Sequence, residues 1–247
     1  DLHSFPTRRS SDLVGDFTIL IALSLFCMGP KAFAGKNPNG EIISDPNAVN
    51  GGVNLSPSSM KLPDSEVKSI LRAPKPAQVV LYIPFQTQQN NYYCGPASAS
   101  MIVNALGYYK TQDQMAKLLG TTKDGTNAGN SVADALNKAV RGSKYIFRWS
   151  WQGYNDISKM KNHVVEALSY GNPVMVNTVE SPGDCYLIGH DVGYTLYHFG
   201  VIGDYFDYGN RVTYVDPGYG RYNGFVMNQT VTIERMSHAT GGRGYAW

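Results

Sequence analysis

The setting of Cys94 suits a reacting thiol. It follows the polar and aromatic stretch QTQQNNYY and directly precedes Gly-Pro and a run of small residues. Pro96 is favoured in the first turn of a helix, where its missing N–H does no harm. A helix N-terminus lowers the pKa of a thiol through the helix dipole and its unpaired N–H groups. We therefore predict that Cys94 is a nucleophile at the start of a helix.

A thiol nucleophile needs a base, usually histidine, and a group that orients the base. His198 opens the apolar stretch HFGVIGDY, and Asp216 follows 18 residues later at the end of TYVD. We expect a hairpin between them that brings the two residues to about three positions from direct register. We predict that His198 lies at a sheet edge and donates its Nδ1–H to Asp216. The loop histidine His190, in the pair His190-Asp191, is the alternative working imidazole.

An acyl oxyanion requires preorganised donors, often a backbone N–H together with a side-chain amide. Gln88, six residues before Cys94, is the candidate amide donor. Gln86 and Gln89 are its competitors in the same polar stretch. The second donor would be the backbone N–H of Cys94.

The surrounding sequence predicts the elements that position these side chains. A strand is expected at 78–85, and helices are expected at 96–106, 111–119 and 131–140. Gly107 is expected to end the first helix, and capping boxes are expected at Thr111/Gln114 and Ser131/Asp134. Strands at 145–151 and 173–179 flank a helix at 156–170, and a hairpin and a last strand follow over 196–236. Helices dominate the first half and strands the second. The pattern predicts an α+β fold in which an N-terminal helical lobe with the cysteine helix packs on an antiparallel sheet that bears His198 and Asp216.

Four motifs in order resemble cysteine peptidase family 39, specifically its stand-alone secreted branch within the papain-like superfamily. They are QQNNYYCGPAS, GNPVMVNT, HFGVIGDY and VTYVDPGYG, and the resemblance covers residues 79–233. It implies a papain-like peptidase fold. It also implies that Cys94 is the nucleophile, His198 the general base, Asp216 its orienter and Gln88 the oxyanion donor. No metal or cofactor is implied.

The composition is that of a globular protein: 43% of the residues are hydrophobic and 16% are charged. The net charge of +2 gives no electrostatic case for binding nucleic acid or an anionic membrane. Two cysteines remain after residue 34, Cys94 and Cys185, and they lack the short spacing of a zinc site. The sequence sets no oligomeric state. The expected partner is a peptide or protein substrate.

The N-terminal region is predicted to lie outside the folded domain. The first 13 residues resemble translated adapter sequence, and FTILIALSLFCMG is too short for a membrane span but suits a signal peptide with a cleavage site near Ala34. We therefore expect a secreted or extracytoplasmic bacterial protein without stable membrane insertion after cleavage. The predicted organisation is a non-native leader and signal peptide at 1–34, a flexible spacer or pro-segment at 35–76, and the peptidase domain at 77–247.

Three other interpretations remain open from the sequence. The same Cys-His-Asp residues would serve an amidase or acyl transferase that acts on cell-wall peptide. The domain would alternatively be a non-catalytic binding module on the same scaffold. Finally, Cys94 and Cys185 would form a structural disulfide.

Overall fold

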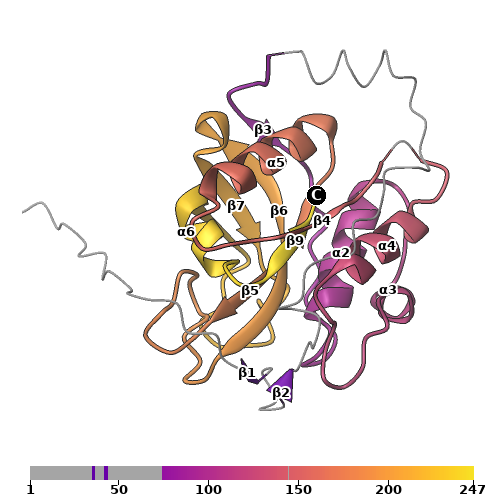
Figure 1. Cartoon of the computed structure of the whole chain (residues 1–247). Coiled ribbons are helices and arrows are strands. Elements are labelled where there is room, and N and C mark those ends of the chain that lie inside the picture. The colour runs from indigo at the N-terminus through magenta and orange to yellow at the C-terminus, as the bar shows by residue number, and fades with distance from the viewer. Residues whose placement is uncertain (1–34, 37–41, 44–73, 144) are drawn as a thin grey trace, which may run out of the picture.

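The protein is described by a computed structural model, which covers residues 35–36, 42–43, 74–143 and 145–247. Three helices near the cysteine lie side by side in Figure 1: α2 (Cys94–Ala105), α3 (Gln112–Leu119) and α4 (Asn130–Ala139). Two further helices, α5 (Ile157–Tyr170) and α6 (Ile233–Ala239), lie on the other side of the sheet. The predicted α+β fold is confirmed.

The sheet has nine strands in the part of the chain that is described. Their bounds are β1 (Gly35–Lys36), β2 (Ile42–Ile43), β3 (Val79–Val80), β4 (Trp149–Trp151), β5 (Val174–Glu180), β6 (Leu196–Phe206), β7 (Arg211–Val215), β8 (Asn228–Thr232) and β9 (Gly244–Ala246). Strand β6 is central, since it pairs with β1, β3, β5 and β7. All pairings are antiparallel except that between β1 and β6.

Each face of the sheet carries its own hydrophobic cluster because side chains alternate along a strand. On β5, Met175 packs with the α2–α4 side, whereas its neighbours Val174 and Val176 pack with α5 and α6. On β6, Val201 packs with the α2–α4 side and Ile202 packs with α5 and α6. The central strands are therefore covered on both faces, so a polar side chain on β6 must find its partners inside the protein.

The local signals for α2 and α3 are confirmed. Gly107, just beyond α2, has φ +83°, as expected of a residue that ends a helix. Thr111 accepts a hydrogen bond from the Gln114 N–H, and the Gln114 side chain accepts one from the Thr111 N–H, which completes the predicted capping box. Helix α5 ends at Gly171 as predicted.

Several predicted elements are wrong in detail. Helix α4 begins after Gly129, which is its N-cap and has a φ of +142°. Ser131 therefore lies inside the first turn and forms no capping box. The strand predicted over 78–85 pairs only at Val79–Val80. The last predicted strand ends at Thr232, whose side chain caps α6 by accepting the Arg235 N–H. Strand β9, with only three residues, was not predicted.

The region before the domain is described only at β1 and β2. Lys36 of β1 pairs with Leu196 of β6. The predicted signal peptide and most of the predicted spacer lie outside the described residues, so these boundaries stay predictions. No helix among the described residues has the length and apolar character needed to cross a membrane.

Candidate active site

Cys94 is the first residue of α2, as predicted. No side chain caps this helix: Tyr93 occupies the N-cap position without a side-chain hydrogen bond. The first N–H groups of a helix have no intrahelical partner, so they favour a negative charge beside them. Cys94 is 7% exposed, which makes it a buried residue with little surface open to solvent.

Gly95 allows another segment to approach the start of α2. A Cβ atom at this position would lie 2.4 Å from Oγ1 of Thr126, which belongs to the loop between α3 and α4. Any larger residue would displace that loop or the N-terminal turn of α2. The close packing of this loop against the start of α2 therefore requires a glycine directly after Cys94.

His198 lies on β6, but not at a sheet edge as predicted. It is the third residue of this central strand, pairs with Thr178 of β5, and is 0% exposed. Among the described residues, its Nδ1 has no hydrogen bond of normal geometry. Burial lowers the pKa of His198, but Asp216 and Cys94 outweigh burial and raise it to about 10. Cys94 thus acts electrostatically on this ring, and Nδ1 is the ring nitrogen that no hydrogen bond occupies among the described residues.

Asp216 binds the other ring nitrogen of His198. Its Oδ1 lies 2.7 Å from His198 Nε2 and also accepts the Gly218 N–H at 2.7 Å. The predicted contact is confirmed, but the prediction of Nδ1 is wrong, because the distal nitrogen reaches Asp216 while Nδ1, nearer the backbone, stays on the cysteine side. With Asp216 ionised, Nε2 carries the proton. Burial raises the pKa of Asp216, but His198 and His190 hold it well below its usual range.

A β-bulge on β6 puts His198 and Asp216 on the same face of the sheet. Val201 pairs with Val215, so Asp216 falls opposite Gly200, two residues from His198. Between Ile202 and Asp204 the register shifts by one residue. Without that shift Asp216 would fall opposite Val201, three residues from His198, as the sequence suggested. Because successive side chains alternate between faces, that register would direct the two side chains to opposite faces.

Gln88 is a buried residue in the loop that precedes α2. Its backbone N–H binds the Pro217 carbonyl at 2.9 Å, next to Asp216. The side-chain Nε2 donates to the Asn90 carbonyl at 2.7 Å and lies 3.4 Å from the Tyr222 hydroxyl. Oε1 has no partner among the described residues. The amide therefore has a fixed orientation and one N–H that makes only a long contact.

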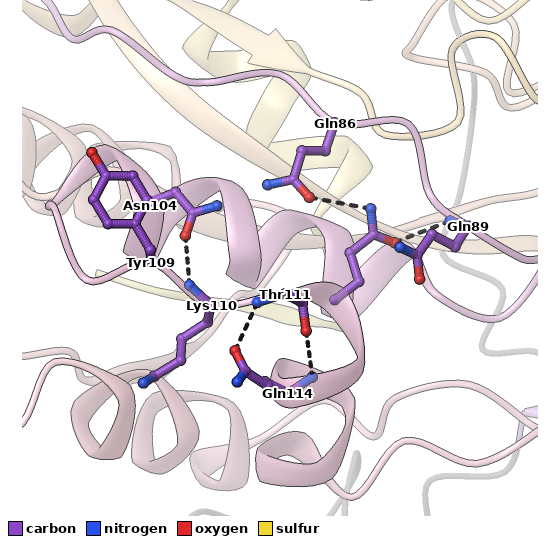
Figure 2. Close-up of a pocket in the computed structure, with 8 residues that line it drawn as sticks. Gln86, Gln89, Asn104, Tyr109, Lys110, Thr111 and Gln114 are labelled. Carbon is purple, nitrogen blue, oxygen red and sulfur yellow. Dashed lines mark hydrogen bonds between the residues drawn. The ribbon is translucent and has the colours of Figure 1, made fainter.

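Gln112, from α3, fixes the backbone on both sides of Gln88. Its Oε1 accepts the Gln89 N–H at 3.0 Å, and its Nε2 donates to the Thr87 carbonyl at 2.9 Å and to the Gln86 side chain at 3.3 Å. Figure 2 shows Gln86 and Gln89 at the edge of a pocket. The pocket has a volume of about 300 Å³. The pocket is lined by Gln86, Gln89, Asn104, Tyr109, Lys110, Thr111, Gln112 and Gln114, without Cys94, His198 or Asp216.

Residues 221 and 222 connect a turn after β7 to the loop that holds Gln88. Arg221 Nε donates to Asn91 Oδ1 at 2.7 Å, and its Nη1 donates to the Gln89 carbonyl at 3.1 Å. Tyr222 lies within hydrogen-bonding distance of Asn91 as well, at 3.3 Å from its Oδ1. Burial and the charge of Cys94 raise the pKa of Tyr222, so its phenol stays neutral.

His190 does not replace His198 in the structure. It lies beyond Asp216, with Nε2 2.9 Å from Asp216 Oδ2, while Nδ1 is 2.7 Å from Glu180 Oε1. The prediction placed His190 in a loop that borders the cleft; it is in the loop before β6 but is fully enclosed. Glu180 was missed altogether. Its position at the end of a hydrophobic strand, followed by the loop that contains His190, was the available signal.

A family match gives these residues a context. The sequence profile described as the Peptidase_C39 like family matches residues 80–237, which include all four predicted site residues. The chain belongs to this family. It is therefore by family a cysteine-type peptidase, and the predicted resemblance is confirmed.

Other known proteins are similar over part of the chain. A protein of Methanothermobacter thermautotrophicus, described as uncharacterized, is 32% identical over 85 residues, which cover 34% of this chain and 54% of that protein. The chain thus spans about half the length of this curated relative.

Solved structures with similar folds include three bacterial proteins. The peptidase domain of Streptococcus ComA, a bifunctional ABC transporter, is 18% identical, with a TM-score of 0.45 and coverage of 66% of this chain and 96% of that one. A C39-like peptidase from Bacillus anthracis has 16% identity, a TM-score of 0.46 and coverages of 69% and 97%. Xylellain, a cysteine protease from Xylella fastidiosa, has 13% identity, a TM-score of 0.46 and coverages of 72% and 88%.

The second cysteine of this peptidase family member does not pair with the first. Cys94 and Cys185 form no disulfide with each other, so the structural-disulfide alternative is wrong. Cys185 is half-buried, and its sulfur lies 3.6 Å from the Ser181 carbonyl.

The histidines and the aspartate are also grouped closely enough to share a metal ion. The ligand atoms of His190, His198 and Asp216 lie within 4.8 Å of one another. Hydrogen bonds between these side chains already account for the grouping, because Asp216 uses one oxygen for each imidazole.

Proposed function

We propose that this protein hydrolyses peptide bonds with Cys94 as the nucleophile, His198 as the general base and acid, and Asp216 as the residue that orients His198. The observation that carries the proposal is that Asp216 Oδ1 lies 2.7 Å from His198 Nε2, which leaves the buried Nδ1 without a hydrogen bond among the described residues, while Cys94 begins α2 and raises the pKa of the ring. A positioned imidazole next to a thiol at a helix N-terminus is the arrangement that thiol acyl-transfer chemistry needs.

The reaction follows from this arrangement. The Cys94 thiolate attacks the scissile carbonyl carbon, and the tetrahedral intermediate collapses to a thioester as the imidazolium of His198 gives its Nδ1 proton to the leaving amine. Neutral His198 then takes a proton from water, which attacks the thioester and releases the acid product and the thiolate. Asp216 remains ionised and stabilises the imidazolium in both steps.

The oxyanion would be stabilised by Gln88 and by the N–H of Cys94. In support, the Gln88 amide is buried, and its backbone is fixed by Gln112 and by Pro217. One Nε2 proton is committed to Asn90. The other, which makes only a 3.4 Å contact with Tyr222, would donate to the oxyanion when substrate is bound.

The proposed substrate is a peptide or protein outside the cytoplasm. The proposal of export rests on the apolar stretch and the Ala-Phe-Ala sequence that ends at Ala34.

The test compares wild-type protein with the Cys94→Ala variant on casein and on purified peptidoglycan. New termini from casein with the wild type alone would support a peptidase. Release of peptidoglycan fragments without cleavage of casein would indicate the amidase or acyl-transferase alternative. Equal activity of Cys94→Ala and the wild type on casein would overturn the proposal, and the absence of turnover on every peptide substrate would favour a binding module.

A further inference from the structure

A second imidazole–carboxylate pair lies behind Asp216. Glu180, the last residue of β5, binds His190 at 2.7 Å, and His190 binds the Asp216 oxygen that His198 does not use, at 2.9 Å. Both side chains are 0% exposed, as is that of Asp216. The buried side chains therefore form an unbroken series from Glu180 through His190 and Asp216 to His198.

We propose that His190 and Glu180 are positioning residues that hold the Asp216 carboxylate ionised and aligned for His198. This inference rests on the proposed function, because it extends the Cys94, His198 and Asp216 machinery by two residues. Neither His190 nor Glu180 contacts the substrate in the proposal.

Asp216 uses both carboxylate oxygens as hydrogen-bond acceptors. Its Oδ1 accepts N–H groups from His198 and Gly218, and its Oδ2 accepts one from His190. Without His190, Oδ2 would be a buried acceptor with no partner, an unfavourable state that is relieved by rotation of the carboxylate or uptake of a proton. Either change would disturb the bond to His198.

His190 also supplies a charge beside Asp216. An imidazole between two ionised carboxylates donates from both nitrogens and is therefore a cation. Burial lowers the pKa of His190, but Glu180 and Asp216 outweigh burial and raise it to about 9. The Glu180–His190 pair is then neutral as a whole, and its positive end faces Asp216. A cation at that distance opposes protonation of the carboxylate.

The groups that face His190 come from several elements. Glu180 approaches from β5, Asp216 from the end of β7, and the His198 ring from β6 at a centroid distance of 5.3 Å. The Tyr214 ring of β7 lies 5.9 Å away, and burial raises the pKa of Tyr214 well above its usual range, so it stays neutral. The remaining ring neighbour, Phe225, has no charge.

The loop between β5 and β6 makes contacts that depend on Glu180 and on the backbone next to His190. Glu180 Oε2 accepts the N–H groups of Tyr186 at 2.7 Å and Leu187 at 3.0 Å. Gly189 has φ +87°, and a Cβ there would lie 2.5 Å from the Gly224 carbonyl oxygen. The backbone next to His190 thus requires glycine for both its conformation and its close packing.

These loop contacts create a rival explanation, in which the pair serves only to hold the loop. Glu180→Gln separates the two explanations. Its amide oxygen would accept the Tyr186 and Leu187 N–H groups, and its NH₂ would donate to His190 Nδ1. His190 would then be neutral but would still donate from Nε2 to Asp216, so the hydrogen bonds remain and the cation is lost.

The measurement is the pH dependence of iodoacetamide alkylation at Cys94, followed by mass spectrometry, which needs no substrate. Loss of the cation near Asp216 disfavours the Cys94 thiolate, so the acid limb of the rate should move up by about one pH unit in Glu180→Gln. Asp191→Asn is the control, since it removes a negative charge from an exposed neighbour in the same loop. It should follow the wild-type profile.

A second variant, His190→Gln, tests whether the charge of Glu180 must be balanced by that of His190. His190→Gln leaves Glu180 buried against an amide oxygen, and the proposal predicts at least a tenfold loss of alkylation rate at pH 7. Glu180→Gln/His190→Gln should recover part of that loss, because two amides can hydrogen-bond to each other and to Asp216. Nitrogen NMR adds a direct readout: at pH 7.5 both His190 ring nitrogens should be protonated in the wild type and one in Glu180→Gln.

The proposal is overturned if the acid limb of Glu180→Gln coincides with that of the wild type. It is also overturned if His190 is already neutral in the wild type at pH 7.5. Unchanged cleavage by Cys94→Ala would instead refute the proposed function and leave these two readouts unaffected.

Discussion

Asp216 binds His198 Nε2 at 2.7 Å although the two residues do not oppose each other on β6 and β7. The bulge in β6 leaves Gly203 between Ile202 and Asp204 and brings His198 and Asp216 to the same face. Their contact therefore depends on a local irregularity of the sheet as well as on the pairing of the hairpin.

Asp216→Asn should lower kcat/KM by about tenfold or more and move the basic limb of its pH profile down by at least about one unit. The basic limb reports loss of the His198 proton, whose pKa of about 10 depends on Asp216. Asp204→Asn is a matched control on the same hairpin, where the carboxylate accepts the Leu81 N–H at 3.1 Å. An unmoved basic limb in Asp216→Asn would contradict the assigned role of the carboxylate.

Gln112→Ala should reduce kcat more than Gln114→Ala, a change of the same type on the same helix. The variant removes the hydrogen bonds on both sides of Gln88 and should cost about 2 kcal/mol of stability. Gln114→Ala, on the same helix, removes the capping-box contact with Thr111 seen in Figure 2 and should cost about 1 kcal/mol without a change in kcat. Kinetics and urea unfolding of both variants provide the comparison; equal kcat values would show that Gln112 does not support the site.

Arg221→Ala should make Cys94 easier to reach. The substitution removes the hydrogen bonds to Asn91 and to the Gln89 carbonyl, which tie the turn after β7 to the Gln88 loop. The alkylation rate of Cys94 should rise several-fold at constant pH. Arg211→Ala, which removes an exposed ion pair with Asp207, should leave this rate unchanged. If the alkylation rate of Cys94 does not rise in Arg221→Ala, the turn after β7 does not limit access to this thiol.

The thermal stability of the protein should fall as pH rises from 7 to 10. His198 and His190 have pKa values of about 10 and about 9 in the folded protein, above the value of about 6.5 in an unfolded chain. Between these values the folded state binds more protons, so stability is present below about pH 6.5 and is lost through the folded pKa values. Asp216 is ionised in both states across this window. Calorimetry should show a shallower decline for Glu180→Gln, and a midpoint that rises with pH would contradict the charge assignment.

Much of the site was predictable from the sequence because its signals are local. Cys94 before Gly-Pro marks a helix start, and the apolar strand and turn around His198 and Asp216 mark a hairpin. The contact between His198 and Asp216 was predicted for these reasons. The capping box at Thr111 and the helix end at Gly107 are equally local.

The remaining features depend on tertiary packing. The extra residue at Gly203 changes the register by one; a glycine inside a strand suggests a bulge, but Gly200 lies in the same strand, so the sequence does not place the shift. Which nitrogen of His198 binds Asp216 depends on the orientation of the imidazole ring in the folded protein. Glu180 and His190 were missed as a pair because a charged residue at a strand end is ordinarily exposed, and only the folded loop buries it with a partner.

The most direct test of the central claim compares the two cysteines of the domain, Cys94 and Cys185. Cys94 is buried and Cys185 is half-buried, so accessibility alone predicts that Cys185 reacts faster with iodoacetamide. The account predicts the opposite order near pH 7, with Cys94 labelled faster in the wild type and losing that advantage in His198→Ala. Faster labelling of Cys185, or equal rates for the two thiols, would contradict the assignment of Cys94 as an activated nucleophile.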